Sequence, residues 1–414
     1  MTTEIIKTNI CIVGAGPAGA TTSIMLAKMG IAHVIVDAAD FPRDKTCGDC
    51  LDLKVVRILN EIDPLIVTNE LSQQQYFAAS AGMRFILPNG KHVELIPEQN
   101  STNKTVAKPI FYVSKRSNFD NLLVEKIDNN YADLRLATRV EKIEREGGGW
   151  RLYTVNNSKK IEIETRMVVG ADGDHSVVLK HLQQRKVDRN NYAAALRQYW
   201  KVVDGMHKEN LIEIYFPASL PFSYFWIFPL PNGEANVGYG MASYYAAKKN
   251  INIRKAFAEL IKHDAYLAPR FKNAQPLEST KGWGIPMAGC KRKAYGNGWL
   301  LVGDAASVVS PTSGEGIGTG MFSGFIAAHF LQRSVQQNKY DEKMFTAYQR
   351  EIHKRLKQEE LLYRFANALP ASIFSAGINA LLSNRFIQKW CTEKEMKRWI
   401  HTAYNEPVQV NLNA

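Results

Sequence analysis

Short apolar runs alternate with a helical pattern near the start of the chain. The run Ile10–Val13 is apolar throughout, as expected for a strand buried on both faces. A helix is expected next, because Ile24 and Ala27 recur at helical spacing and Gly30 supplies a C-terminal stop. A second apolar run at His33–Asp37 ends in an acid. The pattern therefore predicts a strand–helix–strand unit.

Later regions show strand and helix patterns of other kinds. Residues 83–87 and 91–95 flank a Pro-Asn-Gly turn and predict a hairpin, and residues 190–241 indicate several more strands. From Lys339 onward the pattern is helical. Within it, residues 368–382 are apolar but broken by Pro370 and Gly377. This stretch is interpreted as a core helix, a tunnel wall or a segment at a membrane interface.

Two further buried strands end in a glycine–acid turn. Met167–Val169 runs into G-A-D-G, and Trp299–Val302 runs into G-D-A. The second turn is followed by P-T-S-G-E-G-I-G and then by a helix rich in small residues, 323–328. For each acid taken singly, a turn-forming aspartate after a strand is an alternative explanation, but the occurrence of three in this order disfavours it.

The first strand leads into the fingerprint G-x-G-x-x-G. Gly14 permits a tight turn, Gly16 lets the backbone approach a pyrophosphate, and Gly19 lets helix and strand pack closely. The N-terminus of the helix then presents N–H groups to the phosphates. Asp37 lies 23 residues after Gly14, where a carboxylate accepts from ribose hydroxyls. The pattern predicts dinucleotide binding but does not choose between NAD and FAD.

Composition and charge narrow the class of protein. The 414 residues are 45% hydrophobic and 22% charged, which is ordinary for a soluble globular protein. The net charge of +12 is scattered rather than gathered in a basic tail, so no nucleic-acid partner is expected. No signal peptide and no run of about 18 apolar residues is found. We expect a cytoplasmic protein whose five cysteines form no disulfide framework.

Taken together, the three glycine motifs resemble those of FAD-dependent enzymes with the para-hydroxybenzoate hydroxylase-like fold. The resemblance implies one FAD bound in an extended form. It implies that Asp304 holds the ribityl chain, that Arg116 lies beside the cofactor, and that Asp172 is linked to FAD and to a nicotinamide donor. The N–H groups of Gly314–Gly318 would face the pyrimidine side of the flavin. The implied cofactor-binding residues are Gly14, Gly16, Pro17, Ala18, Gly19, Asp37, Arg43, Cys47, Gly48, Arg116, Asp172, Gly303, Asp304, Gly314, Gly316, Ile317 and Gly318.

The segment Phe41–Leu51 contains a C-x-x-C pair and resembles F-P-R-x-K-x-C-G-x-G-L of the geranylgeranyl reductase family. That family uses FAD to saturate isoprenoid C=C bonds, and its cysteine beside the flavin ring matches Cys47. Cys50 replaces a glycine that is common there. A zinc site is disfavoured, because Cys290 and Cys391 lack the paired partner that two more ligands require. We expect no metal, and a redox disulfide remains an alternative.

An aromatic strand is the second mark of that family. Ser223–Pro229 reads S-Y-F-W-I-F-P and resembles its Y-x-W-x-F-P segment, which makes Tyr224 and Trp226 catalytic candidates beside Cys47. Such a strand is equally typical of a protein core. The match to W-x-W-x-I-P of flavin-dependent halogenases is partial, because Tyr224 replaces a Trp and Phe228 an Ile. His175 and Leu179 stand where the middle motif often has arginines.

These features predict an α/β fold of mixed α+β type. It consists of a Rossmann-type FAD-binding domain, an inserted antiparallel β-sheet substrate domain and a helical C-terminal region. The FAD-binding domain is predicted at 1–75, 108–185 and 286–335, the substrate domain at 76–107 and 186–285, and the helical region at 336–414.

The leading functional hypothesis is a reductase that uses NADPH or NADH, through FAD, to reduce C=C bonds of an isoprenoid or other apolar substrate. Cys47, or water beside it, would supply the proton. One alternative is a monooxygenase or halogenase that attacks an aromatic or polyketide-like substrate through a flavin hydroperoxide. Another is a flavin-holding scaffold without turnover. The expected partner is an apolar small molecule or lipid, and contact with a membrane surface stays open.

Overall fold

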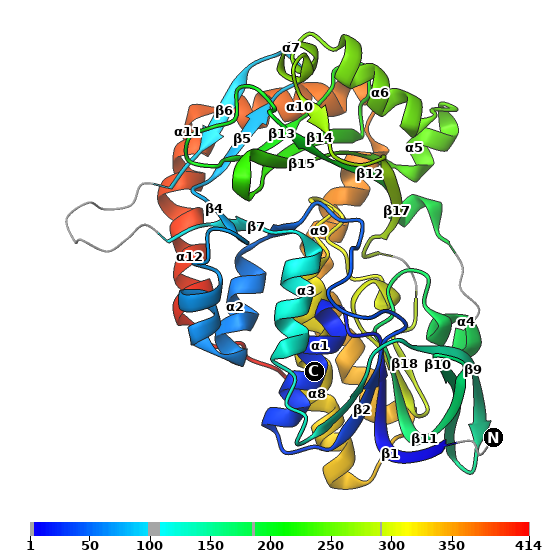
Figure 1. Cartoon of the computed structure of the whole chain (residues 1–414). Helices are drawn as coiled ribbons and strands as arrows, with labels where there is room; N and C mark the ends of the chain where they lie inside the picture. The colour runs from blue at the N-terminus through cyan, green and yellow to red at the C-terminus, as the bar shows by residue number, and fades with distance from the viewer. Residues whose placement is uncertain (1–3, 98–107, 184–186, 290–291, 414) are drawn as a thin grey trace.

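The computed structural model describes residues 4–97, 108–183, 187–289 and 292–413 (Figure 1). Cys290 lies outside them, and so do residues 98–107 of the predicted substrate domain. Within the described residues, two eight-stranded sheets form two layers, with a three-stranded sheet between them.

The first sheet has a parallel centre. Its order β8-β2-β1-β11-β19 is parallel throughout, and β18 pairs with β19 in the antiparallel sense. An antiparallel meander of β9 and β10 extends from β11. The strands are β1 (Glu4–Val13), β2 (His33–Val36), β8 (Ala132–Arg135), β9 (Thr138–Glu146), β10 (Gly149–Asn156), β11 (Lys159–Gly170), β18 (Tyr295–Gly296) and β19 (Trp299–Leu301).

Helices α1 (Pro17–Lys28), α3 (Arg116–Glu125) and α8 (Ile317–Gln337) lie on one side of this sheet, and α4 (Val177–Gln183) packs near β9 and β11. The predicted strand–helix–strand unit is confirmed as β1, α1 and β2. Gly14 closes the turn between β1 and α1 with φ 106°. A Cβ atom there would lie 2.4 Å from the carbonyl oxygen of Ala171, so both the backbone angle and the space require glycine.

The second sheet is antiparallel except for the pair β13–β5, and it confirms the predicted inserted sheet and the hairpin β5–β6. Its order is β16 (Gln275–Pro276), β12 (Tyr192–Lys201), β15 (Glu234–Ala242), β14 (Ser223–Pro229), β13 (Ile212–Tyr215), β5 (Met83–Ile86) and β6 (His92–Leu95), with β17 (Lys281–Pro286) also on β12. Helices α5 (Ser243–Lys248), α6 (Ile253–His263) and α7 (Leu267–Phe271) cover one face. Phe225, Tyr239 and Phe257 are buried between that face and the helices.

Shorter elements complete the two layers. The small sheet consists of β3 (Cys50–Leu51), β7 (Phe111–Val113) and β4 (Ala78–Ser80) and continues into α2 (Leu53–Ile62). Short helical segments are η1 (Ile66–Glu70), η2 (Arg189–Asn191), η3 (Pro231–Gly233), η4 (Gly303–Ala306) and η5 (Glu342–Phe345).

The C-terminal region is helical, as predicted. It contains α9 (Thr346–Ala368), α10 (Ala371–Ser383), α11 (Arg385–Trp390), η6 (Cys391–Glu395) and α12 (Met396–Asn405). Pro370 precedes α10, but the expected break at Gly377 is wrong. The helix continues through Gly377 because a glycine in a helix interior only costs about 1 kcal/mol, which the packing of the rest of α10 offsets. Among the described residues, no helix is long and apolar enough to cross a membrane.

Helices α1 and α8 pack closely at Gly324, and a substitution there tests this packing. A Cβ atom at Gly324 would lie 2.3 Å from the carbonyl oxygen of Ala18, so Gly324→Ala forces the two helices apart. We expect the free energy of unfolding to fall by about 1–3 kcal/mol. Gly377→Ala is the matched control, because nothing lies within 4 Å of its added Cβ, and it should raise stability by up to about 1 kcal/mol. Urea unfolding measures both, and equal stability of the two variants would contradict this packing.

Candidate active site

A cavity of about 800 Å³ is lined by the strand ends of the first sheet on one side and by strands of the second sheet on the other. The structure brings most of the predicted site residues to this cavity. They are Gly14, Gly16, Pro17, Ala18, Asp37, Arg43, Cys47, Gly48, Arg116, Asp172, Tyr224, Trp226, Gly303, Asp304, Gly314, Gly316 and Ile317.

Two predicted residues, Gly19 and Gly318, are not part of this lining. Gly19 lies against the turn before α1, where an added Cβ would be 1.9 Å from the carbonyl oxygen of Gly14. The N–H of Gly318 donates to the Glu315 carboxylate at the start of α8. Gly19 therefore serves helix packing, and the Gly318 N–H is already taken by a side chain of its own loop.

The N-terminus of α1 opens on the cavity and fits a phosphate group. Its N-cap residue Gly16 provides no side-chain hydrogen bond, and the first turn contains no acid. The Nη2 atom of Arg43 lies next to this turn, 3.3 Å from where a Cβ of Gly16 would be. N–H groups, the positive end of the helix dipole and a guanidinium therefore meet at one point. This donor set suits the pyrophosphate of a dinucleotide.

Asp37 has a structural task beside its predicted contact with ribose. One carboxylate oxygen accepts from the Ala15 N–H at 2.7 Å, and the other accepts from the Ala39 N–H at 2.8 Å. The side chain thus joins the turn after β1 to the loop after β2. An acid that fixes the fingerprint turn in this way also presents its remaining lone pairs at the cavity edge.

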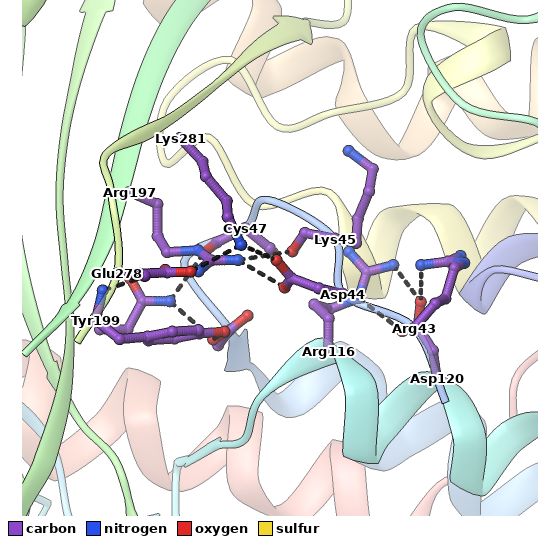
Figure 2. Close-up of polar contacts among 12 residues, drawn as sticks. Arg43, Asp44, Lys45, Cys47, Arg116, Asp120, Arg197, Tyr199, Glu278 and Lys281 are labelled. Carbon is purple, nitrogen blue, oxygen red and sulfur yellow. Dashed lines mark hydrogen bonds and ion pairs between the residues drawn. The ribbon is translucent and has the colours of Figure 1, made fainter. Parts of the chain in front are cut away.

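Two arginines of the cavity share one buried carboxylate, that of Asp120 (Figure 2). Arg116 at the start of α3 donates to Asp120 through Nε at 2.6 Å and Nη2 at 2.7 Å. Arg43 approaches the same carboxylate at 3.1 Å. Asp120 is fully buried, so the pairing is screened little by water. It holds two positive charges beside the cofactor cradle.

Cys47 lies in the loop between these arginines and the second sheet. Its thiol hydrogen-bonds with the Arg116 guanidinium. Burial raises the pKa of Cys47 above its usual value, Arg116 opposes this rise, and the Asp49 carboxylate adds to it. Cys47 and Cys50 are both free thiols. Cys47 is therefore a protonated thiol with a cation in place to stabilise its anion.

Cys50 does not disturb the loop, although it replaces a glycine in the family pattern. It begins the extended strand β3, which any residue can adopt. The residue with positive φ is Asp49, at 63°. Burial raises the pKa of Cys50 well above its usual value, and nearby Asp52 and Glu315 raise it further.

Asp49 is the centre of a buried network behind Cys47. Its Oδ2 atom accepts from the Tyr199 hydroxyl at 2.7 Å and from Asn236 Nδ2 at 2.8 Å. The same Asn236 amide donates to the Cys47 carbonyl at 2.8 Å and accepts from Trp226 Nε1 at 2.9 Å. Burial raises the pKa of Asp49 to about 6, against the hydrogen bond from Tyr199. The network ties the cysteine loop to strands β12, β14 and β15.

Ion pairs outside this network attach the same loop to the second sheet (Figure 2). Arg197 on β12 donates to Asp44 at 2.7 Å and also binds Glu278. Lys281 on β17 binds Asp44 at 2.6 Å and Glu278 at 2.7 Å. Arg197 is 1% exposed, whereas Asp44 is 42% exposed, so this clamp runs from the interior to the protein surface.

Lys45 is a cation inside the cavity that sequence reasoning missed. Its Nζ atom lies 3.3 Å from the centre of the Trp283 ring. Burial lowers the pKa of Lys45 to about 8, although attraction to Asp304 opposes the fall. Burial also raises the pKa of Asp304, with Lys45 opposing. The predicted ribityl-binding acid thus has a cation partner across the cavity.

Asp172 caps a helix as well as lining the cavity. Its Oδ2 atom accepts from the Val177 N–H at 2.6 Å and weakly from that of Val178 at 3.3 Å. Its Oδ1 atom is buried and has no protein partner. Burial raises the pKa of Asp172 to about 6. A buried acceptor without a partner is suited to a ligand hydroxyl or amide.

Glu315 closes the glycine-rich loop before α8, which lines the cavity. Besides Gly318, it binds Lys54 at 3.3 Å, which in turn pairs with Asp52 at 3.1 Å. Burial raises the pKa of Glu315 to about 7, with Asp52 adding to the rise and Lys54 opposing it. The hydroxyl of Tyr224 donates to the Ser313 carbonyl at 2.9 Å, so strand β14 is fixed to the same loop.

Strand β14 provides the aromatic wall of the cavity. Tyr224, Trp226 and Phe228 alternate along the strand and all line the cavity. Phe225 and Ile227 point the other way, into the core of the second layer. The strand is thus both cavity wall and core. Met83, Phe111, Ile212 and Ile214 extend the apolar lining.

The chain is similar to known proteins over most of its length. The family model described as FAD binding domain matches residues 7–360. A digeranylgeranylglycerophospholipid reductase of Methanococcus vannielii is 26% identical over 362 residues, covering 86% of this chain and 85% of the relative. A menaquinone reductase of Mycobacterium tuberculosis is 28% identical over 334 residues, covering 78% and 76%.

Solved structures share the fold. A geranylgeranyl bacteriochlorophyll reductase-like protein from Thermoplasma acidophilum has a TM-score of 0.78 at 22% identity and covers 97% of this chain and 98% of that protein. A flavin-dependent brominase has a TM-score of 0.74 at 17% identity and covers 96% and 93%. The chain therefore belongs to the FAD-binding domain family and is an FAD-dependent oxidoreductase similar to the geranylgeranyl reductases.

Proposed function

We propose that the protein reduces C=C bonds of an isoprenoid or other apolar substrate, with NADPH or NADH as the electron donor. The observation that carries the proposal is the position of Cys47, between the dinucleotide cradle and the aromatic wall of one cavity. The relatives named as reductases support the same reaction class. The apolar wall supports a substrate without many polar groups, because it supplies buried area and few hydrogen-bond partners.

FAD, when bound, supplies the hydride that reduces one carbon of the double bond. Gly14, Gly16 and Arg43 would hold its pyrophosphate and Asp304 its ribityl chain. The chain's own task is to give the second carbon a proton. Cys47 supplies it: the S–H bond breaks, a C–H bond forms, and the thiolate remains beside the Arg116 guanidinium, which stabilises it.

Asp49 sets the conditions for that proton transfer. Its carboxylate disfavours the Cys47 thiolate, so the thiol keeps its proton until substrate is present. Asn236 holds both the Cys47 carbonyl and the Asp49 carboxylate, which fixes the loop relative to Trp226. Tyr224 and Trp226 position the substrate and exclude water from the thiol.

The nicotinamide donor belongs to the same proposal. Asp172 presents a buried, unpartnered oxygen at the cavity, where a donor's amide or hydroxyl would bind. We extend the proposal to contact with a membrane surface at the cytoplasmic side, because an apolar substrate of this class is carried in lipid.

The fold shared with a brominase supports a second candidate, an O₂-dependent monooxygenase or halogenase. The two candidates differ in whether the reduced enzyme needs oxygen for product formation, since the same cofactor cradle serves both.

The first test of function is anaerobic reoxidation. Purified enzyme is bleached with NADPH or NADH without oxygen and then mixed with prenyl lipids such as geranylgeranyl diphosphate or a menaquinone. We expect the yellow absorbance to return and the lipid to gain one H₂ for each reduced bond. Product that forms only with O₂ would support the second candidate instead. If neither NADPH nor NADH bleaches the flavin, the protein would be a flavin-holding scaffold without turnover.

Removal of the proposed proton donor is the second test. Cys47→Ala should bind FAD normally but slow the reoxidation step by about 10²-fold or more, because general acid catalysis contributes this much. Cys50→Ala is the matched control, since that thiol also lines the cavity but lies near Asp52 and Glu315, which disfavour its anion. Stopped-flow absorbance measures both variants. Full turnover by Cys47→Ala would remove Cys47 from this role.

The influence of Asp49 on Cys47 is testable without any substrate. A nearby carboxylate raises a thiol pKa, so Asp49→Asn should move the pH midpoint of Cys47 alkylation downward. The variant suits the site, because Asn tolerates positive φ and its amide oxygen can accept from Tyr199 and Asn236.

Iodoacetamide labelling of the Cys47 peptide across pH, read by mass spectrometry, gives that midpoint. Asp44→Asn, which changes another carboxylate of the same loop, should leave it in place. A midpoint that rises or stays fixed in Asp49→Asn would show that the carboxylate does not act on this thiol.

A further inference from the structure

The C-terminal helices expose an unusual number of large apolar side chains. Phe386 is 78% exposed and Phe365 is 65% exposed. We call the group the apolar strip; it consists of Leu361, Leu362, Phe365, Ile373, Leu381, Phe386 and Trp390. All seven lie within one segment of the chain, on the end of α9, on α10 and on α11. So many large apolar side chains exposed within one segment indicate an interaction surface rather than ordinary solvent exposure.

Helix α10 has an inner face that packs on the protein and an outer face that is exposed, and the strip residues of α10 lie on the outer face. Its inner side packs on the protein: Phe374 stacks on Phe222 with 4.3 Å between ring centres, and Ile378 and Leu382 join a buried cluster. Its outer side is exposed and carries no charge, and the hydroxyl of Ser372 in the first turn is its one polar group. The outer residues are Ser372, Ile373, Ala376, Gly377, Ala380 and Leu381. Both faces of α10 are therefore mainly apolar, but only the inner one is covered by the chain.

The charges within the strip are all basic. Between Leu361 and Thr392 the sequence contains Arg364, Arg385 and Lys389 and no acidic residue. Acidic residues flank this stretch, Glu359 and Glu360 before it and Glu393 and Glu395 after it, where Lys394, Lys397 and Arg398 outnumber them beside Trp399, which is 46% exposed. Basic residues and tryptophans that flank an apolar helix face are typical of segments lying in a bilayer interface.

We propose that the apolar strip is a docking face for an anionic lipid bilayer, with α10 and α11 lying in the interface. An anionic bilayer can bury the exposed apolar side chains and attract the basic residues around them. A second copy of this chain fits less well, because docking would bring two basic faces together.

If the proposed function holds, the position of α10 would place the cavity close to a substrate dissolved in the bilayer. Met83 and Phe111 line the cavity and also pack in the cluster that contains Ile378 and Leu382. The turn of the β5–β6 hairpin is joined to α10 by the Asn89 N–H, which donates to Asn379 at 3.3 Å. Figure 1 shows α10 across the second sheet, with α11 and α12 beside it. A substrate dissolved in the bilayer would thus meet the apolar side of the cavity first.

The test uses the FAD-loaded full chain and vesicles without substrate, so its outcome does not depend on the reductase reaction. Flotation is measured with phosphatidylcholine vesicles and with vesicles that also contain about 30% phosphatidylglycerol, at low and high salt. We expect about tenfold stronger binding to the anionic vesicles, weakened by salt. Wild-type protein that stays in solution with both vesicle types would overturn the proposal.

Substitutions in the apolar strip test whether this part of the protein binds the bilayer. Ile373→Ser/Leu381→Ser/Phe386→Ser should weaken vesicle binding about tenfold or more, because apolar burial drives interfacial insertion. The control Leu65→Ser/Val202→Ser/Leu277→Ser removes equally exposed side chains elsewhere and should bind as wild type does. Arg385→Gln/Lys389→Gln should lose the preference for anionic vesicles.

Flavin absorbance and circular dichroism confirm that each variant is folded. Equal binding by the strip variant and the control would overturn the proposal. So would light scattering that shows a lipid-free dimer which the strip variant dissociates, because the strip would then be an interface between copies.

Discussion

The loop from Arg43 to Asp49 is the constraint on which the rest of the site depends, because it is bound to both layers at once. On the dinucleotide side, Arg43 reaches the buried Asp120 carboxylate, which also holds Arg116. On the other side, Arg197 and Lys281 hold Asp44. Losing a partner of the buried Asp120 carboxylate costs about 3–5 kcal/mol, since it leaves an uncompensated charge, whereas the half-exposed pairs of Asp44 contribute less. Tyr199 and Asn236 hold Asp49 at the other end, so both ends of the loop that presents the Cys47 thiol are fixed.

Much of the fold could be predicted because its signals are local. The turn at Gly14, the helix that follows and the apolar strand at His33–Val36 form a unit whose every residue is near its neighbours in sequence. The hairpin β5–β6 was predictable for the same reason. The parallel pairing of β13 with β5 was not, because those strands are far apart in the chain. Gly377 misled the prediction, since a local helix breaker was outweighed by the packing of α10 on the second sheet.

The site was predicted where a motif marks it and missed where only folding creates it. The three glycine motifs, Cys47 and Tyr224 all come to one cavity. Asp49 was overlooked because its partners Tyr199 and Asn236 lie 150 and 187 residues away. Asp120 could have been found, because it follows Arg116 at the i, i+4 spacing of a helical ion pair.

Strand β14 separates positions that hold the framework from positions that shape the cavity. Phe225 and Ile227 are buried in the core between the second sheet and its helices, whereas Tyr224, Trp226 and Phe228 face the cavity. Replacements at these three positions alter the shape of the cavity, while the core on the other face of the strand stays intact. The choice of substrate and the stability of the fold thus fall on opposite faces of one strand, in a fold that proteins named as a reductase and as a brominase share.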